Sequence, residues 1–336
     1  MAATGGKKTR IIDIHGHLNV PGVRALLGSG AGVHGGGGQA GAQMPTPGGI
    51  SDPARTPILY DMAARLADMD ATGVDAMALS PTPQPGFYKA DRELAQKVAA
   101  LQNDYVARVA ADNRGRFIGF GIAQLQHPED AAGELERAVR ELGFKGVFVA
   151  THIGNDELGD PRFDPFWAAA QDLGAVVFVH PMGFTEPRRL EPFFMTNVVG
   201  QPLETTLALA HMIFGGTLER FPRLKVLAVH GGGFLPFYLG RFEQAFHERK
   251  ECRVHIQKPP KEYVKRIYFD TVVFEPEAIA YLIALVGVDH VLMGSDRPFD
   301  MGDNDPVELV KRVPNLTDAD RARILGGNAE TLLNLA

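Results

Sequence analysis

Histidine and aspartate side chains stand at the ends of several short apolar runs of this 336-residue chain. His15 and His17 end the first run, His180 the fifth, His230 the sixth and Asp296 the eighth. Residues two apart in an extended strand face the same side, so the first two imidazoles point in one direction. Three imidazole nitrogens and one carboxylate suit a divalent transition metal, and the expected ligands are His15, His17, His180 and Asp296. We expect one metal ion, zinc in the first place, although manganese would also accept these ligands.

The same residues have a simpler explanation, in which each histidine hydrogen-bonds to a backbone carbonyl at the end of its strand. A His-X-His pair occurs by chance in many proteins, and a single histidine or aspartate says less. Their joint occurrence favours a metal, because several histidines and an aspartate crowded together without a cation would be costly. Such crowding requires a fold that brings these strand ends together.

Eight apolar runs rich in Val, Ile, Leu and Phe recur along the chain, and most are followed by a stretch with helical periodicity. Alternating strands and helices are typical of a parallel sheet, and strands that are apolar on both faces indicate a closed barrel. We predict an α/β fold, with one (β/α)8 TIM-type barrel domain over residues 1–336. The expected strands begin near Arg10, Asp75, Phe117, Gly146, Ala175, Lys225, Arg266 and His290, and the expected helices cover residues 60–72, 92–113, 129–142, 205–220 and 276–286.

Some segments lie outside this repeat. Residues 28–49 follow the first strand, hold many of the 38 glycines and are expected to form a long flexible loop. Residues 182–201 follow the fifth strand, so both segments lie at the end of the barrel where such enzymes build their sites. From Leu316 onward we expect two short C-terminal helices, the second capped by Asn328. His290, just before the last strand, is expected to be exposed.

The composition excludes several classes of partner. A formal net charge of −6 argues against nucleic acid and anionic membranes, because these surfaces bind clustered Lys and Arg. No run reaches about 18 apolar residues, so no segment is expected to span a bilayer. The single cysteine, Cys252, cannot form an intrachain disulfide, and the residues before the first apolar run do not read as a signal peptide. We expect a cytoplasmic protein.

The order of the candidate ligands along the strands resembles that of the amidohydrolase superfamily. Further motifs are similar to the branch typified by aminocarboxymuconate-semialdehyde decarboxylase. They are LETT at 203–206, LERFPRLK at 218–225, which leads into HGGG at 230–233, and GSDRPF at 294–299. The similarity covers nearly the whole chain and is strongest over residues 177–299.

This resemblance implies a division of labour among the polar residues. One metal ion would be held by His15, His17, His180 and Asp296. His230 would be the free acid/base, and Asp296 would share the handling of protons. Losing carbon dioxide leaves negative charge on carbon, which a proton donor and a polarising metal ion both relieve.

The resemblance also implies how a carboxylate substrate is held. The arginine at the position of Arg241 reaches into the neighbouring subunit's site in the resembling decarboxylase, which implies a homodimer here. A guanidinium suits this task because it can bind two carboxylate oxygens at once. Arg297, Phe299 and Met182 are the other expected substrate contacts. Arg297 and Met182 stand where the family decarboxylase has an aromatic residue and a Trp, so the pocket wall is expected to differ.

We expect a metal-dependent nonoxidative decarboxylase of an aromatic, hydroxybenzoate-like acid or of a carboxymuconate-semialdehyde-type acid. The alternative is a hydrolase of the same superfamily that opens a lactone, ester or amide with a metal-bound hydroxide. The same five polar residues serve both reactions. A barrel that binds without catalysis is a third interpretation, and the presence of all five residues counts against it.

Overall fold

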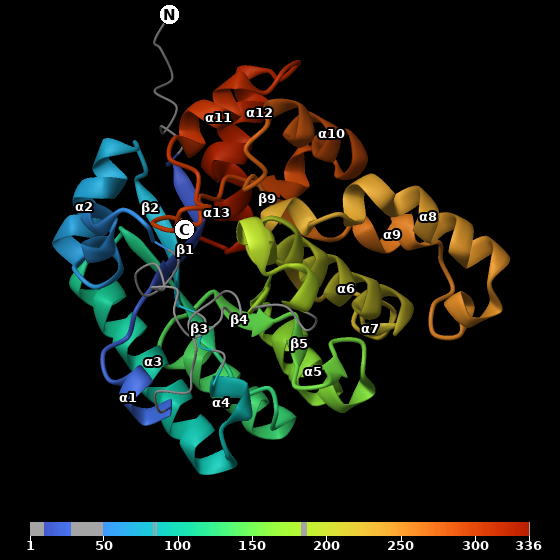
Figure 1. Ribbon diagram of the computed structural model, residues 1–336, viewed down its shortest axis with the longest axis horizontal. Helices are drawn as coiled ribbons and strands as arrows, with labels where there is room; N and C mark the ends of the chain where they lie inside the picture. Colours follow the sequence, from blue (N-terminus) through green and yellow to red (C-terminus); the bar gives the residue numbers. More distant parts are fainter. Residues whose placement is uncertain (1–9, 28–49, 83, 85, 183–186, 336) are drawn as a thin grey trace, which may run out of the picture.

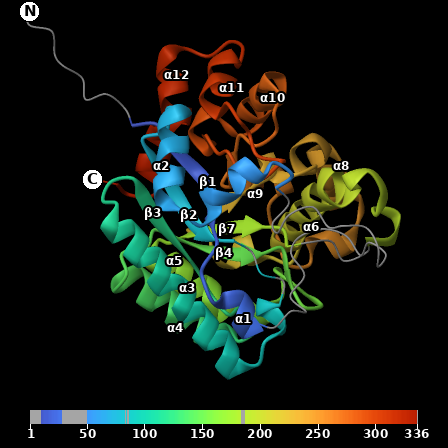
Figure 2. The ribbon, with the colours of Figure 1, turned by 60° about the vertical axis from the view of Figure 1, so that its left-hand side comes forward.

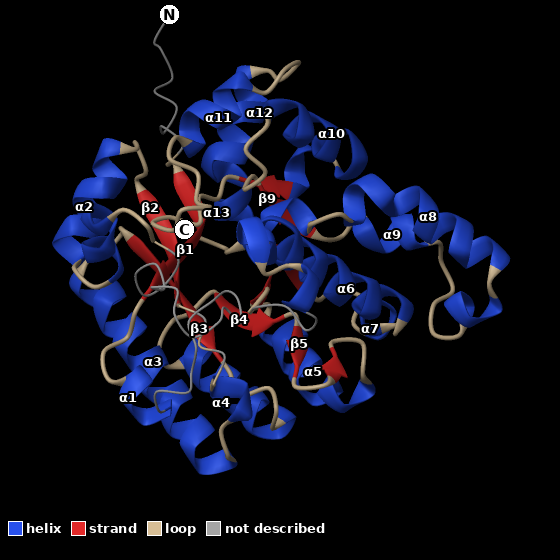
Figure 3. Ribbon diagram, viewed as in Figure 1, coloured by secondary structure: helices blue, strands red, loops and turns tan. Residues whose placement is uncertain are grey.

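Eight short parallel strands curve around a common axis, and helices cover them on the outside (Figures 1 and 3). The computed structural model describes residues 10–27, 50–82, 84, 86–182 and 187–335. In their order around the sheet, the strands are β1 (Ile12–Leu18), β2 (Ala76–Pro81), β3 (Phe117–Ile122), β4 (Gly146–Ala150), β7 (Val176–His180), β8 (Lys225–Ala228), β9 (Tyr268–Asp270) and β10 (Val291–Leu292). The predicted TIM-type architecture is confirmed. The expected loop over residues 28–49 lies outside the described residues.

Backbone contacts between the first and last strands nearly close the barrel. The amide of Ile14 donates to the carbonyl of Met293 at 2.9 Å, and the amide of Asp296 donates to the carbonyl of His15 at 2.9 Å. Two of the expected metal ligands, His15 and Asp296, are therefore joined directly by the bond that closes the barrel.

Aromatic side chains fill the interior. The Phe178 ring centroid lies 5.9 Å from that of Phe120 and 6.3 Å from that of Phe148, and all three residues are buried. The same Phe178 ring lies 4.9 Å from the imidazole of His15. These aromatic side chains pack inside the barrel below the polar residues at the strand ends, as expected for strands buried on both faces.

The helices follow the strands in chain order, and α3, α4 and α5 lie beside one another on the outside of the barrel (Figure 2). Two-residue strands β5 (His152–Ile153) and β6 (Asp156–Glu157) form a small hairpin after β4. The helices are α1 (Val23–Leu27), α2 (Met62–Ala71), α3 (Arg92–Asp112), α4 (Pro128–Arg140), α5 (Asp164–Leu173), α6 (Gln201–Phe214), α7 (Thr217–Arg220), α8 (Leu235–Glu248), α9 (Pro260–Val264), α10 (Pro276–Val286), α11 (Pro306–Arg312), α12 (Asp318–Ala322) and α13 (Asn328–Leu332).

Two details of the predicted helices are wrong. The helix expected over residues 205–220 is divided into α6 and α7 at Gly215 and Gly216, and the φ of Gly216 is +79°, outside the helical region. Asn328 does not cap the last helix but lies inside its first turn. Its side-chain amide donates to the carbonyls of Val288 and Val291, both at 2.8 Å, and so ties α13 to the strand β10.

The loop after β7 contains short helical turns at Pro187–Arg189, Pro192–Phe194 and Thr196–Gly200 before α6 begins. The helices α8 and α9 contact α6, and α8 extends away from the barrel (Figure 1). Among the described residues, no helix is both long and apolar enough to cross a bilayer.

Candidate active site

The imidazoles of His15 and His17, both fully buried on β1, are oriented through their Nδ1 atoms. His15 Nδ1 donates to Asp270 Oδ2 at 2.7 Å, because an ionised carboxylate only accepts hydrogen bonds. His17 Nδ1 lies 2.9 Å from Ser80 Oγ, whose hydroxyl donates to the Gly16 carbonyl at 3.3 Å and can therefore accept from His17. Both rings then direct Nε2 toward the barrel mouth. Burial opposes protonation of His15, but the carboxylates of Asp296 and Asp270 outweigh it and raise its pKa, so a metal ion bound at its Nε2 would displace a proton.

His180 follows the same rule at the end of β7. Its Nδ1 lies 2.8 Å from the carbonyl oxygen of Pro181, and a carbonyl can only accept, so Nδ1 carries the proton. The lone pair of its ring is then also on Nε2. A second hydrogen bond that fixes ring and tautomer is typical of metal-binding histidines.

These nitrogens converge with the carboxylate of Asp296. The Nε2 atoms of His15 and His17 are 3.1 Å apart, and Asp296 Oδ1 lies 3.4 Å from the first and 3.5 Å from the second. His230 Nε2 lies 3.4 Å from Asp296 Oδ2, and the ligand atoms of His15, His180, His230 and Asp296 all lie within 4.8 Å of one another. Lone pairs that face one another at these distances fit a bound cation, so the residues present suit a divalent metal ion.

Electrostatics favours the ligand forms of two of these groups. Burial opposes ionisation of Asp296, but the neighbouring His15 and His17 outweigh it and hold the pKa of this carboxyl well below its usual value. Burial, together with the nearby His17 and His15, lowers the pKa of His180 well below its usual value. At neutral pH the site therefore contains a carboxylate anion and a neutral imidazole, the forms that bind metal ions.

A tight backbone turn at residues 230–233 brings His230 to the site. Gly231, Gly232 and Gly233 have φ values of +58°, +78° and +64°, a region that favours glycine. A Cβ atom on Gly233 would lie 2.1 Å from the carbonyl oxygen of Pro202, so the glycine also permits this close approach. The three glycines therefore allow the backbone to turn tightly beside the site.

The comparisons with known proteins agree with this geometry. The family model described as amidohydrolase matches residues 12–335. The chain belongs to the amidohydrolase family. A 2-amino-3-carboxymuconate-6-semialdehyde decarboxylase of Dictyostelium discoideum is 35% identical to this amidohydrolase over 277 residues, which are 82% of this chain and 77% of the relative.

Solved structures of decarboxylases resemble the whole amidohydrolase barrel. A 5-carboxyvanillate decarboxylase from Sphingomonas paucimobilis superposes with a TM-score of 0.83 at 27% identity, over 98% of this chain and 100% of the other. The enzyme of the same name from Novosphingobium aromaticivorans, with bound manganese and 3-methoxy-4-hydroxy-5-nitrobenzoic acid, gives a TM-score of 0.85 at 26% identity over 99% of each chain. The predicted resemblance to the decarboxylase branch is confirmed.

Asp270 is a residue of the amidohydrolase site that the sequence analysis missed. It ends β9, is fully buried, and joins two parts of the site. Oδ2 accepts from His15, while Oδ1 accepts from the amide of Gly231 at 2.9 Å. The available signal was the polar residue that ends the seventh apolar run, in the sequence RIYFD.

The structure brings two of the expected substrate contacts to the site. The ring centroids of Phe299 and His17 are 5.8 Å apart, and the half-buried Met182 comes just after His180 and Pro181. Arg241 lies on the exposed surface of α8.

The guanidinium of Arg297 is paired with other side chains of the fold. Its guanidinium forms two hydrogen bonds with the carboxylate of Asp68 and a third, at 2.8 Å, with Asn304 Oδ1. The side chains of Arg297 and Asp68 are only 12% and 13% exposed. The charge of this arginine is therefore used inside the fold.

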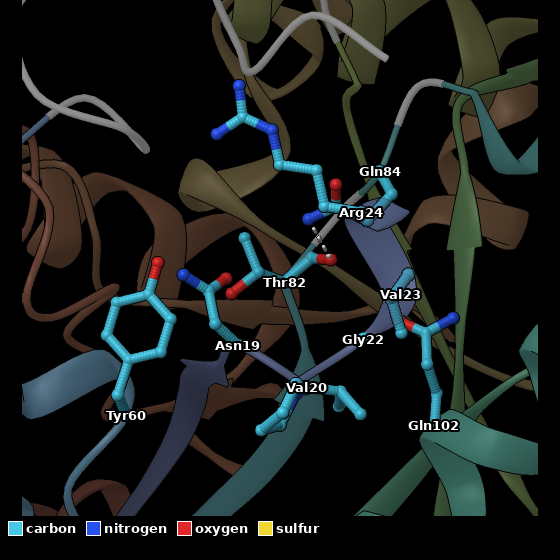
Figure 4. A pocket seen from close by; sticks show the side chains of 10 residues that line it. Asn19, Val20, Gly22, Val23, Arg24, Tyr60, Thr82, Gln84 and Gln102 are labelled. Carbon is cyan, nitrogen blue, oxygen red and sulfur yellow. Dashed lines mark hydrogen bonds between the residues drawn. The ribbon is translucent and has the colours of Figure 1, made fainter. Parts of the chain in front are cut away.

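A cavity of about 160 Å³, lined by both apolar and polar side chains, opens beside the ends of β1 and β2 (Figure 4). Asn19 and Thr82 come from these strand ends, with Tyr60 and Gln102 on opposite sides of the cavity. Thr82 and Gln102 are 3% and 1% exposed, and within the described part of the chain Thr82 Oγ1 and Gln102 Nε2 make no hydrogen bond. Buried polar atoms usually have a partner, so these two are available to a ligand or to water.

Proposed function

We propose that this amidohydrolase is a metal-dependent nonoxidative decarboxylase of a hydroxylated aromatic acid or a carboxymuconate-semialdehyde-type acid. The observation that carries the proposal is the convergence on Asp296 of the Nε2 atoms of His15 and His17 and of a ring nitrogen of His180, with His230 beside the other oxygen of the same carboxylate. The decarboxylase names of the relatives support the reaction type.

The chain's own residues would manage the proton. His230 Nε2, beside Asp296 Oδ2, is placed to deliver a proton to the ring or diene carbon that bears the carboxylate. The bond from that carbon to the carboxylate then breaks, its electron pair restores the unsaturated system, and carbon dioxide leaves. When bound, the metal ion would polarise the substrate oxygens. Asp296 would stabilise the imidazolium form of His230 before the proton is transferred, and the ring would be neutral afterwards.

The five polar side chains of the site can be assigned as four metal ligands and one acid/base. We assign His15, His17, His180 and Asp296 to the metal, and His230 to the proton. A shell of three nitrogens and one oxygen suits zinc, while the manganese in a related structure makes manganese the alternative.

The carboxylate of the substrate would be held across a homodimer. Arg241 lies on α8, three and four residues after the aromatic side chains of Tyr238 and Phe237. These two side chains are 49% and 75% exposed. The Phe237 ring lies 6.3 Å from that of Tyr281 on α10, which is 46% exposed. A second copy of the chain would cover these rings and place Arg241 at its partner's site.

The cavity beside the ends of β1 and β2 would receive the part of the substrate that points away from the metal ligands. A cavity of about 150 Å³ can hold a benzene ring, so this one is large enough for part of an aromatic acid. Its lining offers the neutral donors and acceptors of Thr82 and Gln102 for a hydroxyl or methoxy substituent, and the guanidinium of Arg24 for a negatively charged one.

Product chemistry tests the proposal. The purified protein, with its metal content measured, is incubated with a panel of hydroxybenzoates and carboxylated muconates, and carbon dioxide release is recorded. A parallel panel of lactones and esters, followed by proton release, tests the hydrolase alternative. Turnover of the acids supports the proposal, whereas turnover of the lactones alone would overturn it. Metal-free protein is the control in both panels.

A further inference from the structure

Two side chains of the helix α2 contact segments that carry proposed metal ligands. One contacts the backbone of His17, and the other contacts Arg297, the residue that follows Asp296. Arg65 and Asp68 make these contacts, and residues three apart lie on the same face of a helix. One contacts the end of β1 and the other contacts the segment after β10.

Arg65 is a fully buried cation. Its Nη2 donates a short hydrogen bond to the carbonyl of His17, and its Nη1 lies 3.2 Å from Met77 Sδ. Burying a guanidinium costs free energy unless it is paired or hydrogen-bonded. An apolar side chain would fill this position at less cost, so the contact with His17 explains why an arginine is useful here.

Asp68 binds the residue next to Asp296. Arg297 Nε lies 3.0 Å from Asp68 Oδ2, and Arg297 Nη2 forms a second, shorter bond to Oδ1. Such a two-pronged pair fixes direction as well as distance. Asp296 itself has a φ of +56°, an unfavourable region for a residue with a side chain. The two hydrogen bonds between Asp68 and Arg297 restrain the backbone next to Asp296 and so help to maintain its positive φ.

We propose that Arg65 and Asp68 are positioning residues for the metal. From one rigid helix they set the position of His17, through its carbonyl, relative to Asp296, through Arg297. The inference rests on the proposed metal site but not on the decarboxylation reaction. It also gives Arg297 a role other than substrate binding.

The test compares two aspartates of the same helix. Asp68→Asn removes the charge that holds Arg297, whereas Asp70→Asn removes a carboxylate that is 66% exposed and paired with Arg116. Both variants are stripped of metal and titrated with Zn²⁺ or Mn²⁺ against a chelator of known affinity. Thermal unfolding of the metal-free proteins gives the structural effect separately. Because no substrate is present, failure of the proposed reaction would leave this result unaffected.

We expect Asp68→Asn to weaken metal binding about 10- to 100-fold, the usual effect of losing a group that orients a ligand, and Asp70→Asn to change it less than about twofold. Asp68→Glu should restore part of the affinity. Unchanged affinity in Asp68→Asn, with or without a lower unfolding temperature, would overturn the proposal and leave the bridge as a purely structural contact.

A second variant protects the test if Asp68→Asn does not fold. Arg65→Lys keeps the buried charge but cannot reproduce the geometry of the guanidinium toward the carbonyl of His17. Weaker metal binding in this variant supports the proposal. A variant Arg297→Lys that raises KM while metal affinity stays constant would instead make Arg297 a substrate contact and refute the positioning role.

Discussion

Asp270 Oδ2 lies 2.7 Å from His15 Nδ1, while the other oxygen of the same carboxylate accepts the amide of Gly231. One buried side chain thus orients a metal ligand and anchors the turn that presents His230. Because the carboxylate fixes the proton on Nδ1, it keeps Nε2 available to the metal.

Substitution Asp270→Asn should therefore impair the site more than the fold. We expect metal affinity to fall about 10- to 100-fold, because the amide no longer enforces the ring's tautomer. Chelator competition on the purified protein measures this loss. Asp172→Asn, which changes an aspartate that is 70% exposed, is the matched control. Equal affinities in the two variants would show that Asp270 does not orient His15.

Removing the proposed acid/base should separate catalysis from metal binding. His230→Asn is expected to lower kcat by roughly 10²- to 10⁴-fold, the usual contribution of a positioned proton donor. Metal content measured by elemental analysis should stay at one ion per chain. His211→Asn, on the exposed face of α6, should keep full activity. Full turnover in His230→Asn, or loss of the metal, would show that the assignment is wrong.

Mixed dimers test whether Arg241 acts across the interface. Neither Arg241→Ala nor His230→Asn should turn over alone. If Arg241 serves the partner's site, a mixed dimer contains one intact site, and random exchange of equal amounts should restore about a quarter of the wild-type rate. Measured carbon dioxide release after subunit exchange decides the matter. No recovery in verified mixed dimers would place Arg241 in its own subunit's site, and full turnover of Arg241→Ala alone would place it outside any site.

The cavity beside the ends of β1 and β2 should contribute to substrate choice. Thr82→Val keeps the shape of the side chain and removes the buried hydroxyl. We expect kcat/KM to fall about 5-fold for an acid whose hydroxyl or methoxy group enters the cavity, since each buried hydrogen bond contributes about 1 kcal/mol. An acid without that group should be unaffected. Steady-state kinetics on such a matched pair checks this, and parallel losses for both acids would contradict it.

His290 should make the fold sensitive to acid. It is half-buried and stacked on Tyr268, with ring centroids 4.6 Å apart, so the expectation that it is exposed is wrong. Burial lowers its pKa below the usual 6.5, so the unfolded chain takes up a proton before the folded chain does. Its contribution to stability is complete above about pH 6.5 and declines as the pH falls toward the lowered folded pKa.

Urea unfolding at pH 8 and pH 5 measures this effect. His290→Phe should lose less stability between the two pH values than the wild type does. His247→Phe, at an exposed position on α8, should behave like the wild type. If His290→Phe and the wild type lose the same stability, then His290 is not the acid-sensitive group.

The strands and the polar residues at their ends could be predicted from the sequence because each depends on local pattern. A strand buried on both faces must be apolar throughout, so a histidine or aspartate at its end stands out. The helix α10 was predicted with its observed bounds because the helical periodicity of residues 276–286 is also a local pattern.

Features that depend on contacts between distant segments could not be predicted. The pairing of Arg297 with Asp68 joins positions 229 residues apart, and neither residue is unusual in its local sequence. Gly216 interrupts a helical pattern that is otherwise continuous. Asn328 resembles a helix cap until the carbonyls of β10 are seen beside it. In each case the neighbour that decides the outcome comes from elsewhere in the fold.

The bonds that close the barrel also set when the site can exist during synthesis. Asp13 near the start of the chain accepts from Ser295, 282 residues later, and His15 is joined to Asp296 in the same way. A chain emerging from the ribosome would hold its first two histidines long before their carboxylate partner is made. Capture of the metal would therefore be one of the last events of maturation and would mark a barrel that has been completed.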